Sequence, residues 1–478
     1  MTFNSITFLI FFAVVSLLLL ITKIDIKVKK EKMARIRHII LLLTSYVFYG
    51  WWNWKCAVLM LVLSYIAYWT SLKADKTNSK IYLTIGIVFP LVILGIFKYF
   101  NFFIDSFCYL LGITKAGSLN IILPVGISFY TFQSMSYTMD VYRRQVDCEK
   151  SFVKLALYIS FFPQLVAGPI VKAKEFIYQL YEDRNINWIN FKEGIQVFVF
   201  GLFKKIVIAD NISVCVDAVF NMPQRYHAIS ILMAVIGYSI QIYCDFSGYS
   251  DMAIGSAKIL GYDLTRNFNM PYVAKNISAF WKRWHISLST WLQEYLYISL
   301  GGNRKGEIRT YVNLFLTMLI GGLWHGASWT FVVWGALHGL ALCVHKAWMK
   351  LSGHDKKYKG TLVGNFISII ITYIFVSFCW IFFRAESFEV ANDVIMGIVS
   401  WQDGIMFVSS WTILGIVCVL VSTIVAWIRS CIKKTEIQGF YFTVNLETIW
   451  GMVLLFVAIG ICLSLAYTGS SPFIYFQF

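Results

Sequence analysis

The sequence predicts an all-α integral membrane protein, a polytopic helical bundle of roughly 10–12 transmembrane helices with re-entrant and interfacial helices around a central tunnel. Three observations support this fold class. Of the 478 residues, 58% are hydrophobic and only 14% are charged, whereas soluble domains are about 45–50% apolar and about 25% charged. The mean hydropathy is +0.67. Apolar runs recur along the whole chain with no long polar stretch between them, which indicates one membrane-embedded body.

Nine segments have the length and apolar character of a helix that crosses a hydrocarbon core of about 30 Å. They are 6–21, 38–54, 56–72, 81–100, 121–142, 227–244, 361–383, 411–428 and 449–467. The first has no basic residues before it and no cleavage site after it, so we expect a retained transmembrane helix rather than a signal peptide. Pro, Gly-Gly pairs or charges interrupt three more apolar stretches, 152–170, 194–216 and 311–344, some of which we expect to be re-entrant or buried.

The loop charges predict the topology. Basic residues cluster between alternate spans, as at 27–37 and 346–359, whereas 385–403 contains acidic residues and no Lys or Arg. Because basic loops stay in the cytoplasm, we expect both termini to be extracytoplasmic, in a multi-pass protein of the cell (inner) membrane. These loops also account for the net charge of +16, so we expect the lipid bilayer and no nucleic acid as a partner. The ten cysteines are scattered without metal-ligand spacing, so no metal site is expected.

These patterns divide the chain into N-terminal transmembrane helices (1–120), a core (121–345), C-terminal transmembrane helices (346–467) and an extracytoplasmic C-terminal tail (468–478). Charged, Gly and Pro residues are mixed into apolar sequence across 160–340. Ionisable groups at membrane depth cost about 2.5–3.5 kcal/mol each, so they usually face a cavity or a partner. The core is therefore predicted to line a polar tunnel; the alternative is a set of surface loops and interfacial helices.

Three histidines lie within this apolar core, and a buried neutral imidazole is the usual general base. His285 lies in 280–297, where apolar residues at 281, 284, 288, 291 and 295 predict one amphipathic interfacial helix. His325 is flanked by Gly321, Gly322 and Gly326, small residues that would let a ligand approach the backbone. His338 is expected to be a hydrogen-bonded core residue.

Several motifs in the core are similar to those of one known family. They include Leu123–Phe129 (LPVGISF), Phe162–Ile170 (FPQLVAGPI), Tyr243–Asp251 (YCDFSGYSD), Phe280–Ser289 (FWKRWHISLS), Gly301–Arg304 (GGNR) and Gly322–Ala327 (GLWHGA). In this order they resemble the membrane-bound O-acyltransferases, and within them the bacterial alginate O-acetyltransferase branch. The resemblance covers roughly residues 120–345, which makes this core the predicted catalytic core.

The resemblance implies an O-acetyltransferase. It would take an acetyl group from a cytosolic thioester, with acetyl-CoA as the donor and no permanently bound cofactor, and pass it across the membrane to an extracytoplasmic polysaccharide through an extracytoplasmic partner enzyme. The preferred catalytic histidine of the family corresponds to His325 and the second to His285. A histidine in a dry tunnel can take the proton of an attacking hydroxyl. Arg283 and Arg304 are possible contacts for a negatively charged donor. The polymer is left open between alginate-like exopolysaccharide, peptidoglycan and cellulose.

The chain ends in Ser470–Phe478 (SSPFIYFQF), which has two interpretations. Aromatic residues at the end of a membrane protein commonly anchor it at the lipid interface. The ending is also similar to the terminal acyl-accepting motif of the teichoic-acid D-alanylation system, and Tyr475 would then carry the acyl group. A phenol with a pKa near 10 is a better leaving group than a sugar hydroxyl, so an acetyl-tyrosine can pass its acyl group onward.

Two other functions stay open at this point. One is a transporter that moves a small solute through the polar core, although no internal repeat is found. The other is an acyltransferase of the same family that modifies a lipid or a protein rather than a polysaccharide.

Overall fold

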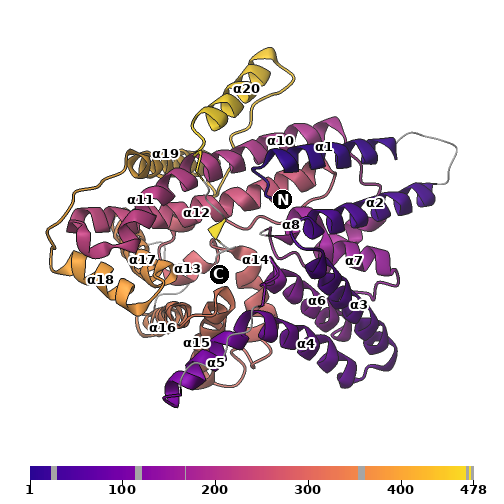
Figure 1. Cartoon of the computed structure of the whole chain (residues 1–478), viewed down its shortest axis with the longest axis horizontal. Coiled ribbons are helices and arrows are strands. Elements are labelled where there is room, and N and C mark those ends of the chain that lie inside the picture. Colours follow the sequence, from indigo (N-terminus) through magenta and orange to yellow (C-terminus); the bar gives the residue numbers. More distant parts are fainter. Residues whose placement is uncertain (23–29, 114–120, 167, 354–360, 470–472, 475–478) are drawn as a thin grey trace. The chain divides into compact units, whose positions relative to one another are not determined.

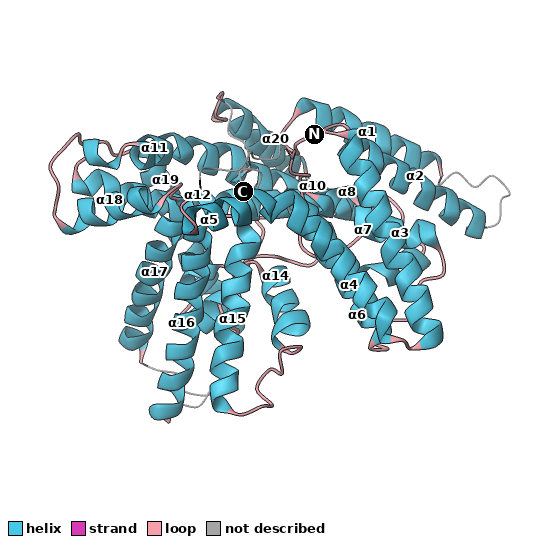
Figure 2. Cartoon of the chain, turned by 60° about the horizontal axis from the view of Figure 1, so that its bottom comes forward, coloured by secondary structure: helices cyan, strands magenta, loops and turns pink. Residues whose placement is uncertain are grey.

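A computed structural model describes residues 1–22, 30–113, 121–166, 168–353, 361–469 and 473–474. Over these ranges the chain forms α-, 3-10 and π-helices and no β-strand; an isolated bridge pairs Tyr226 with Ile405. The all-helical fold is visible in Figure 1 and, coloured by secondary structure, in Figure 2. The predicted all-α class is confirmed.

The chain divides into two compact units. Unit 1 comprises 1–199 and 249–265, and unit 2 comprises 200–248 and 266–478. Both units contain parts of the helices α10 (Trp188–Leu202) and α12 (Ala228–Ile259). The four segments predicted from the sequence are consecutive stretches of the chain, whereas the two units are defined by which residues contact one another. The division into four segments therefore stays a prediction.

Unit 1 is built around a small bundle in which α3 packs against α2, α4, α6 and α7, and α4 also packs against α6 (Figure 1). The core of this bundle is α6, in which every residue from Ile127 to Val141 is buried. Of the other elements of unit 1, α1 packs against α2, and the remaining ones are shorter helices. In chain order the elements are α1 (Ile6–Ile21), α2 (Lys30–Gly50), α3 (Trp54–Thr77), α4 (Lys80–Leu94), η1 (Gly95–Tyr99), α5 (Phe100–Leu110), α6 (Ile127–Tyr142), α7 (Phe152–Ser160), α8 (Phe162–Leu165), α9 (Ala173–Phe176) and η2 (Ile177–Tyr181).

Unit 2 contains three neighbouring helices, α15, α16 and α17, that stand side by side in Figure 2. The short helices α13 and α14 carry the FWKRWHISLS motif; α13 packs against α16, and the π-helix η6 that follows α14 packs against α15. The elements of unit 2 are η3 (Phe203–Ala209), α11 (Asp210–Asn221), η4 (Pro223–Arg225), η5 (Pro271–Val273), α13 (Ile277–Trp281), α14 (Ile286–Trp291), η6 (Leu292–Tyr297), α15 (Glu307–His325), α16 (Trp329–Leu351), α17 (Leu362–Arg384), α18 (Phe388–Val399), α19 (Ser410–Lys433) and α20 (Ile449–Ser464).

Among the described residues, six helical stretches are long and apolar enough to cross a membrane. They are Trp54–Thr77, Lys80–Leu110, Ala228–Ile259, Trp329–Leu351, Leu362–Arg384 and Ser410–Lys433. Two shorter apolar helices, α1 and α20, coincide with the first and last predicted spans. The chain is therefore a multi-pass membrane protein, while the count of roughly 10–12 crossings and the orientation of the termini stay predictions.

All three interrupted stretches are interrupted in the structure, but in 311–344 the break does not fall at Gly321 and Gly322, which lie inside α15. Within 152–170 the helices α7 and α8 are separated at Phe161, shortly before Pro163. Residues 311–344 form α15 and α16, with the break immediately after His325. In 194–216 the interruption is the π-helix η3, which carries the buried Lys205. Such π-helical turns occur often at functional sites.

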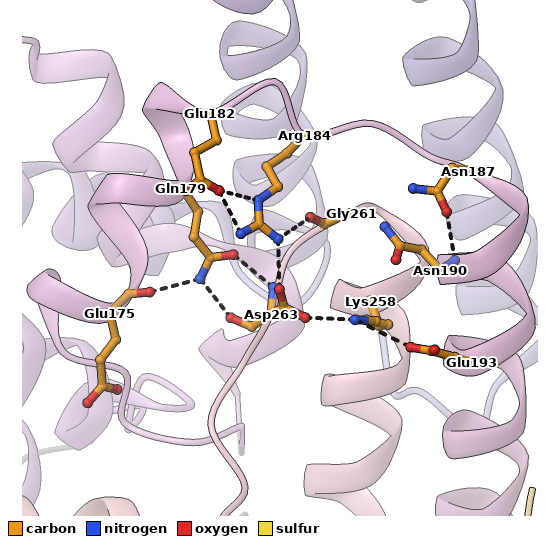
Figure 3. Close-up of polar contacts among 10 residues, drawn as sticks. All are labelled: Glu175, Gln179, Glu182, Arg184, Asn187, Asn190, Glu193, Lys258, Gly261 and Asp263. Carbon is orange, nitrogen blue, oxygen red and sulfur yellow. Dashed lines mark hydrogen bonds and ion pairs between the residues drawn. The ribbon is translucent and has the colours of Figure 1, made fainter.

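A polar network connects separate parts of unit 1 (Figure 3). Asp263 follows α12 and forms ion pairs with Arg184 at 2.7 Å and Lys258 at 3.0 Å. Gln179 Nε2 donates to the Asp263 carbonyl, and the Asp263 N–H donates back to Gln179 Oε1. Lys258 also pairs with Glu193 at 3.4 Å. The network joins η2, the following loop, α10 and the end of α12.

Candidate active site

His325 is the last residue of α15, where that helix meets α16. Its side chain is buried, with only 4% of the residue exposed. Three aromatic rings surround the imidazole, with centroids 5.0 Å (Trp324), 5.0 Å (Trp334) and 5.2 Å (Phe383) from its own. The end of a helix carries a partial negative charge, which favours a histidine when it becomes protonated. The position therefore suits a base that gains a positive charge during a reaction.

The glycines beside His325 have a different role from the expected one. A Cβ on Gly322 would lie 2.3 Å from the Phe331 carbonyl oxygen of α16, and one on Gly326 would lie 2.2 Å from the Phe331 ring. Both positions favour glycine because the end of α15 and the residue after it pack closely against Phe331 of α16, which holds the end of α15 in place. The expectation that they keep space for a ligand is wrong for these two residues.

His285 is the N-cap of α14 and has a left-handed backbone, with φ 42° and ψ 56°. The predicted single amphipathic helix over 280–297 is wrong, because this residue separates α13 from α14 and the segment ends in the π-helix η6. A left-handed non-glycine residue is strained by about 1–3 kcal/mol and persists only where the surroundings hold it. Here the surroundings are the backbone and side chain of Asn267.

Asn267 is fully buried and organises the start of α14. Its carbonyl accepts the Ile286 N–H at 2.9 Å, and its side-chain Oδ1 accepts the Ser287 N–H at 3.2 Å and the Ser287 hydroxyl at 2.9 Å. The same Oδ1 lies 3.1 Å from His285 Nδ1. Because an amide oxygen only accepts, Nδ1 carries the proton and donates, which leaves Nε2 with its lone pair. Asn267 is not predictable from the sequence, because it lies in a loop and has no motif spacing to His285.

The two histidines lie close together in unit 2. Their ring centroids are 6.4 Å apart, with an angle of 60° between the ring planes, and Trp324 lies 6.1 Å from His285. His285 is 0% exposed and also contacts Phe246 of α12 edge-on at 4.7 Å. The arrangement brings two imidazoles into one buried, aromatic-walled region, where each can accept a proton from a hydroxyl group.

Tyr475 lies outside the described residues. The two described residues that precede it, Phe473 and Ile474, are 1% and 5% exposed. The Phe473 ring centroid lies 6.0 Å from that of Phe246, the ring that also contacts His285. The Ile474 N–H donates to Asp245 Oδ2 at 2.9 Å. These two residues of the C-terminal tail are therefore packed inside unit 2, one ring away from His285, rather than exposed as an interfacial anchor would be.

The other residues considered from the sequence have different surroundings. His338 is fully buried as expected, but within the described residues neither of its ring nitrogens has a hydrogen-bond partner; it packs between Phe280, Trp281 and Trp334 instead. Arg283 donates to the carbonyls of Asn269 and Ile437, so its guanidinium supports the backbone. Arg304 is exposed.

A family model matches residues 39–383 of the chain, and it describes the membrane-bound O-acyltransferase family. The chain belongs to this family. The match includes His285, His325 and Asp245 and ends before the C-terminal tail. The protein is therefore a membrane-bound O-acyltransferase, and the transporter interpretation is set aside.

Three relatives illustrate the range of the family. A probable alginate O-acetylase of Pseudomonas aeruginosa is 40% identical over 379 residues, which cover 77% of this chain and 71% of the relative. A peptidoglycan O-acetyltransferase of Helicobacter pylori is 40% identical over 390 residues, covering 75% and 73%. A teichoic acid D-alanyltransferase of Bacillus subtilis is 28% identical over 288 residues, covering 56% and 71%.

Proposed function

We propose that this O-acyltransferase takes an acetyl group from cytosolic acetyl-CoA and delivers it across the inner membrane to an extracytoplasmic polysaccharide, an alginate-like exopolysaccharide or peptidoglycan. The observation that carries the proposal is the buried pair of His325 and His285 with its aromatic walls. The acetyl group and the polysaccharide are supported by the relatives named for alginate and peptidoglycan acetylation, which are about 40% identical, against 28% for the D-alanyl relative.

In the proposed first step, His325 takes the proton of the Tyr475 hydroxyl as the phenol oxygen attacks the thioester carbonyl. The new C–O bond forms, the C–S bond breaks, and the leaving thiolate takes the proton from His325. The helix end beneath His325 stabilises the imidazolium formed in between. His285, with its Nδ1–H held by Asn267, has Nε2 as a second acceptor and holds the hydroxyl by its proton before that proton passes to His325.

In the second step, a hydroxyl of the acceptor attacks the acetyl-tyrosine ester. The acetyl group moves to the acceptor oxygen, and the tyrosine oxygen recovers a proton from the acceptor. An extracytoplasmic partner enzyme would complete this transfer to the polymer. The step is downhill because a phenol with a pKa near 10 is a better leaving group than a sugar hydroxyl. Burial of Phe473 and Ile474 beside the ring that contacts His285 supports the relay.

Substitution of His325 and Tyr475 tests both steps. We expect His325→Ala to lower acetylation of the polymer about 10²-fold or more, because a general base contributes about 10²–10⁴ to a rate. Tyr475→Phe should abolish polymer acetylation and leave no acetyl label on the tail of the purified protein after incubation with labelled acetyl-CoA. His338→Gln is the control, because it replaces a buried histidine that has no proposed role in catalysis. The protein level in the membrane is measured for each variant.

Each result bears on a separate claim. If polymer acetylation survives His325→Ala at a normal protein level, His325 is not the general base. If it survives Tyr475→Phe, Tyr475 does not carry the acetyl group. If label from acetyl-CoA appears on a lipid or a protein rather than on a polysaccharide, the proposed acceptor is wrong.

A further inference from the structure

A buried group of three charged residues lies in unit 2, formed by Lys205 of η3, Asp210 at the start of α11 and Asp245 of α12. Their side chains are 4%, 7% and 1% exposed. Lys205 Nζ lies 2.7 Å from Asp210 Oδ1 and 2.5 Å from Asp245 Oδ1. Buried ion pairs are weak contributors to stability, because desolvation offsets the attraction, so their presence calls for another explanation.

The two oxygens of Asp245 have separate partners. Oδ1 faces Lys205, whereas Oδ2 accepts the backbone N–H of Ile474 at 2.9 Å. A hydrogen bond to a charged carboxylate is about twice as strong as a neutral one. Because Lys205 pairs with Oδ1, the carboxylate is held from one side, and Oδ2 is directed to the Ile474 N–H. This hydrogen bond to the backbone N–H fixes the position of Ile474 against α12.

Two residues between α20 and Ile474 are also hydrogen-bonded to this part of unit 2. Asn211 Nδ2 donates to the Leu465 carbonyl at 3.0 Å. The Tyr467 N–H donates to the Ile206 carbonyl at 3.3 Å. Together with the contact at Ile474, these bonds attach the end of the chain to η3, α11 and α12 through polar groups that are more than 200 residues away in the sequence.

We infer that Asp245, fixed by Lys205, is the docking site of the C-terminal tail and a positioning residue for acyl transfer. Docking at Ile474 holds the residue directly before Tyr475, and Asp245 is followed by Phe246, whose ring contacts both Phe473 and His285. The carboxylate therefore registers the tail against the histidine pair. The catalytic part of this inference rests on the proposed acetyl-tyrosine relay; the docking itself does not.

The tail side of the contact is tested by Ile474→Pro, which removes the donated N–H, with Ile474→Val as the matched control that retains it. The body side is tested by Asp245→Ala, with Asp210→Ala as the control, since both remove a carboxylate from Lys205 and, of the two, Asp245 is the one that accepts the Ile474 N–H. Hydrogen exchange of the remaining tail amides, measured by mass spectrometry on the purified full chain, reports docking without any chemistry. The tail should exchange about tenfold faster or more in Ile474→Pro and Asp245→Ala than in their controls.

Acetyl label on Tyr475 from labelled acetyl-CoA gives the second readout. Ile474→Pro should form it at least about tenfold more slowly than Ile474→Val, while the KM for acetyl-CoA stays unchanged, since only the acceptor is misplaced. If Asp245→Ala does not fold, the comparison of Ile474→Pro with Ile474→Val still tests whether the tail docks. Tail exchange and labelling that are equal in Ile474→Pro and Ile474→Val overturn the docking inference. If Ile474→Pro speeds tail exchange but Tyr475→Phe still acetylates the polymer, the tail docks at Asp245 and the acetyl-tyrosine relay is wrong.

Discussion

Asn267 Oδ1 receives donors from one short segment, the N–H and hydroxyl of Ser287 and the Nδ1–H of His285. The Ser287 backbone N–H can only donate, so it fixes this atom as the amide oxygen and, with it, the tautomer of His285. Neither fact can be read from the sequence, because Asn267 and His285 are 18 residues apart and no periodic pattern links them. The histidine itself was predictable from its motif; its orientation was not.

We expect Asn267→Ala to lower the rate of acyl transfer about 10-fold to 10³-fold, because His285 then loses its fixed tautomer and its left-handed backbone loses support. The KM for acetyl-CoA should change little if the residue acts through His285, to which its side chain is bonded. Ser287→Ala is the matched control: it removes one hydroxyl from Oδ1 and keeps the bond to His285, so most activity should remain. Kinetics on purified variants of equal thermal stability provide the check. An Asn267→Ala enzyme as active as Ser287→Ala would show that the tautomer is unimportant.

At the scale of elements, hydropathy located most helices but not their interruptions. The span 6–21 coincides with α1, and the break after His325 falls within the predicted interrupted stretch. The segment 280–297 has helical spacing, yet tertiary bonds from Asn267 override it and turn the chain at His285. Likewise, Lys205 signals a charge in an apolar run, but its partners Asp210 and Asp245 are known only from the fold. Local pattern predicts a helix, and distant contacts decide where it is broken.

The packing of α15 on α16 gives a prediction at this scale. Gly322→Ala should destabilise the protein by about 1–3 kcal/mol or more, because its Cβ would lie 2.3 Å from the Phe331 carbonyl oxygen and 2.9 Å from Gly335 Cα, and backbone atoms cannot move aside. Acyl transfer should fall as well, since the displaced helix end carries His325. Gly321→Ala is the control, because its nearest neighbour is the flexible end of Leu292 at 3.1 Å. Thermal unfolding in detergent measures the difference, and equal melting temperatures for the two variants would contradict the packing argument.

For the whole molecule, composition and loop charge predicted a multi-pass helical protein, and the motifs predicted its family, because both signals are local to the sequence. The two contact units were not predictable, since unit 1 joins 1–199 to 249–265 across more than 40 intervening residues. The charged network around Asp263 is one of the contacts that make this join. Arg184 and Lys258 appear in the sequence only as isolated charges in a basic protein, and nothing in their spacing indicates a shared partner.

This network predicts how the stability of unit 1 depends on pH. Burial raises the pKa of Asp263, but the hydrogen bonds and charges of Lys258 and Arg184 outweigh it, and the pKa is lowered from its ordinary value of 3.8. A carboxyl group whose pKa is lower in the folded state stabilises the fold above its unfolded pKa, and this contribution is lost as the pH falls below about 4.

Asp263→Asn should therefore lower the melting temperature slightly at pH 7, by about 1–2 °C, because partly exposed pairs contribute only about 0–1 kcal/mol each. The difference from the unsubstituted protein should shrink as the pH approaches 3. Asp403→Asn, which removes a fully exposed carboxylate 4.0 Å from His227, should leave the melting temperature unchanged over the same range. A difference for Asp263→Asn that stays constant down to pH 3 would mean that its charge does not hold these segments together.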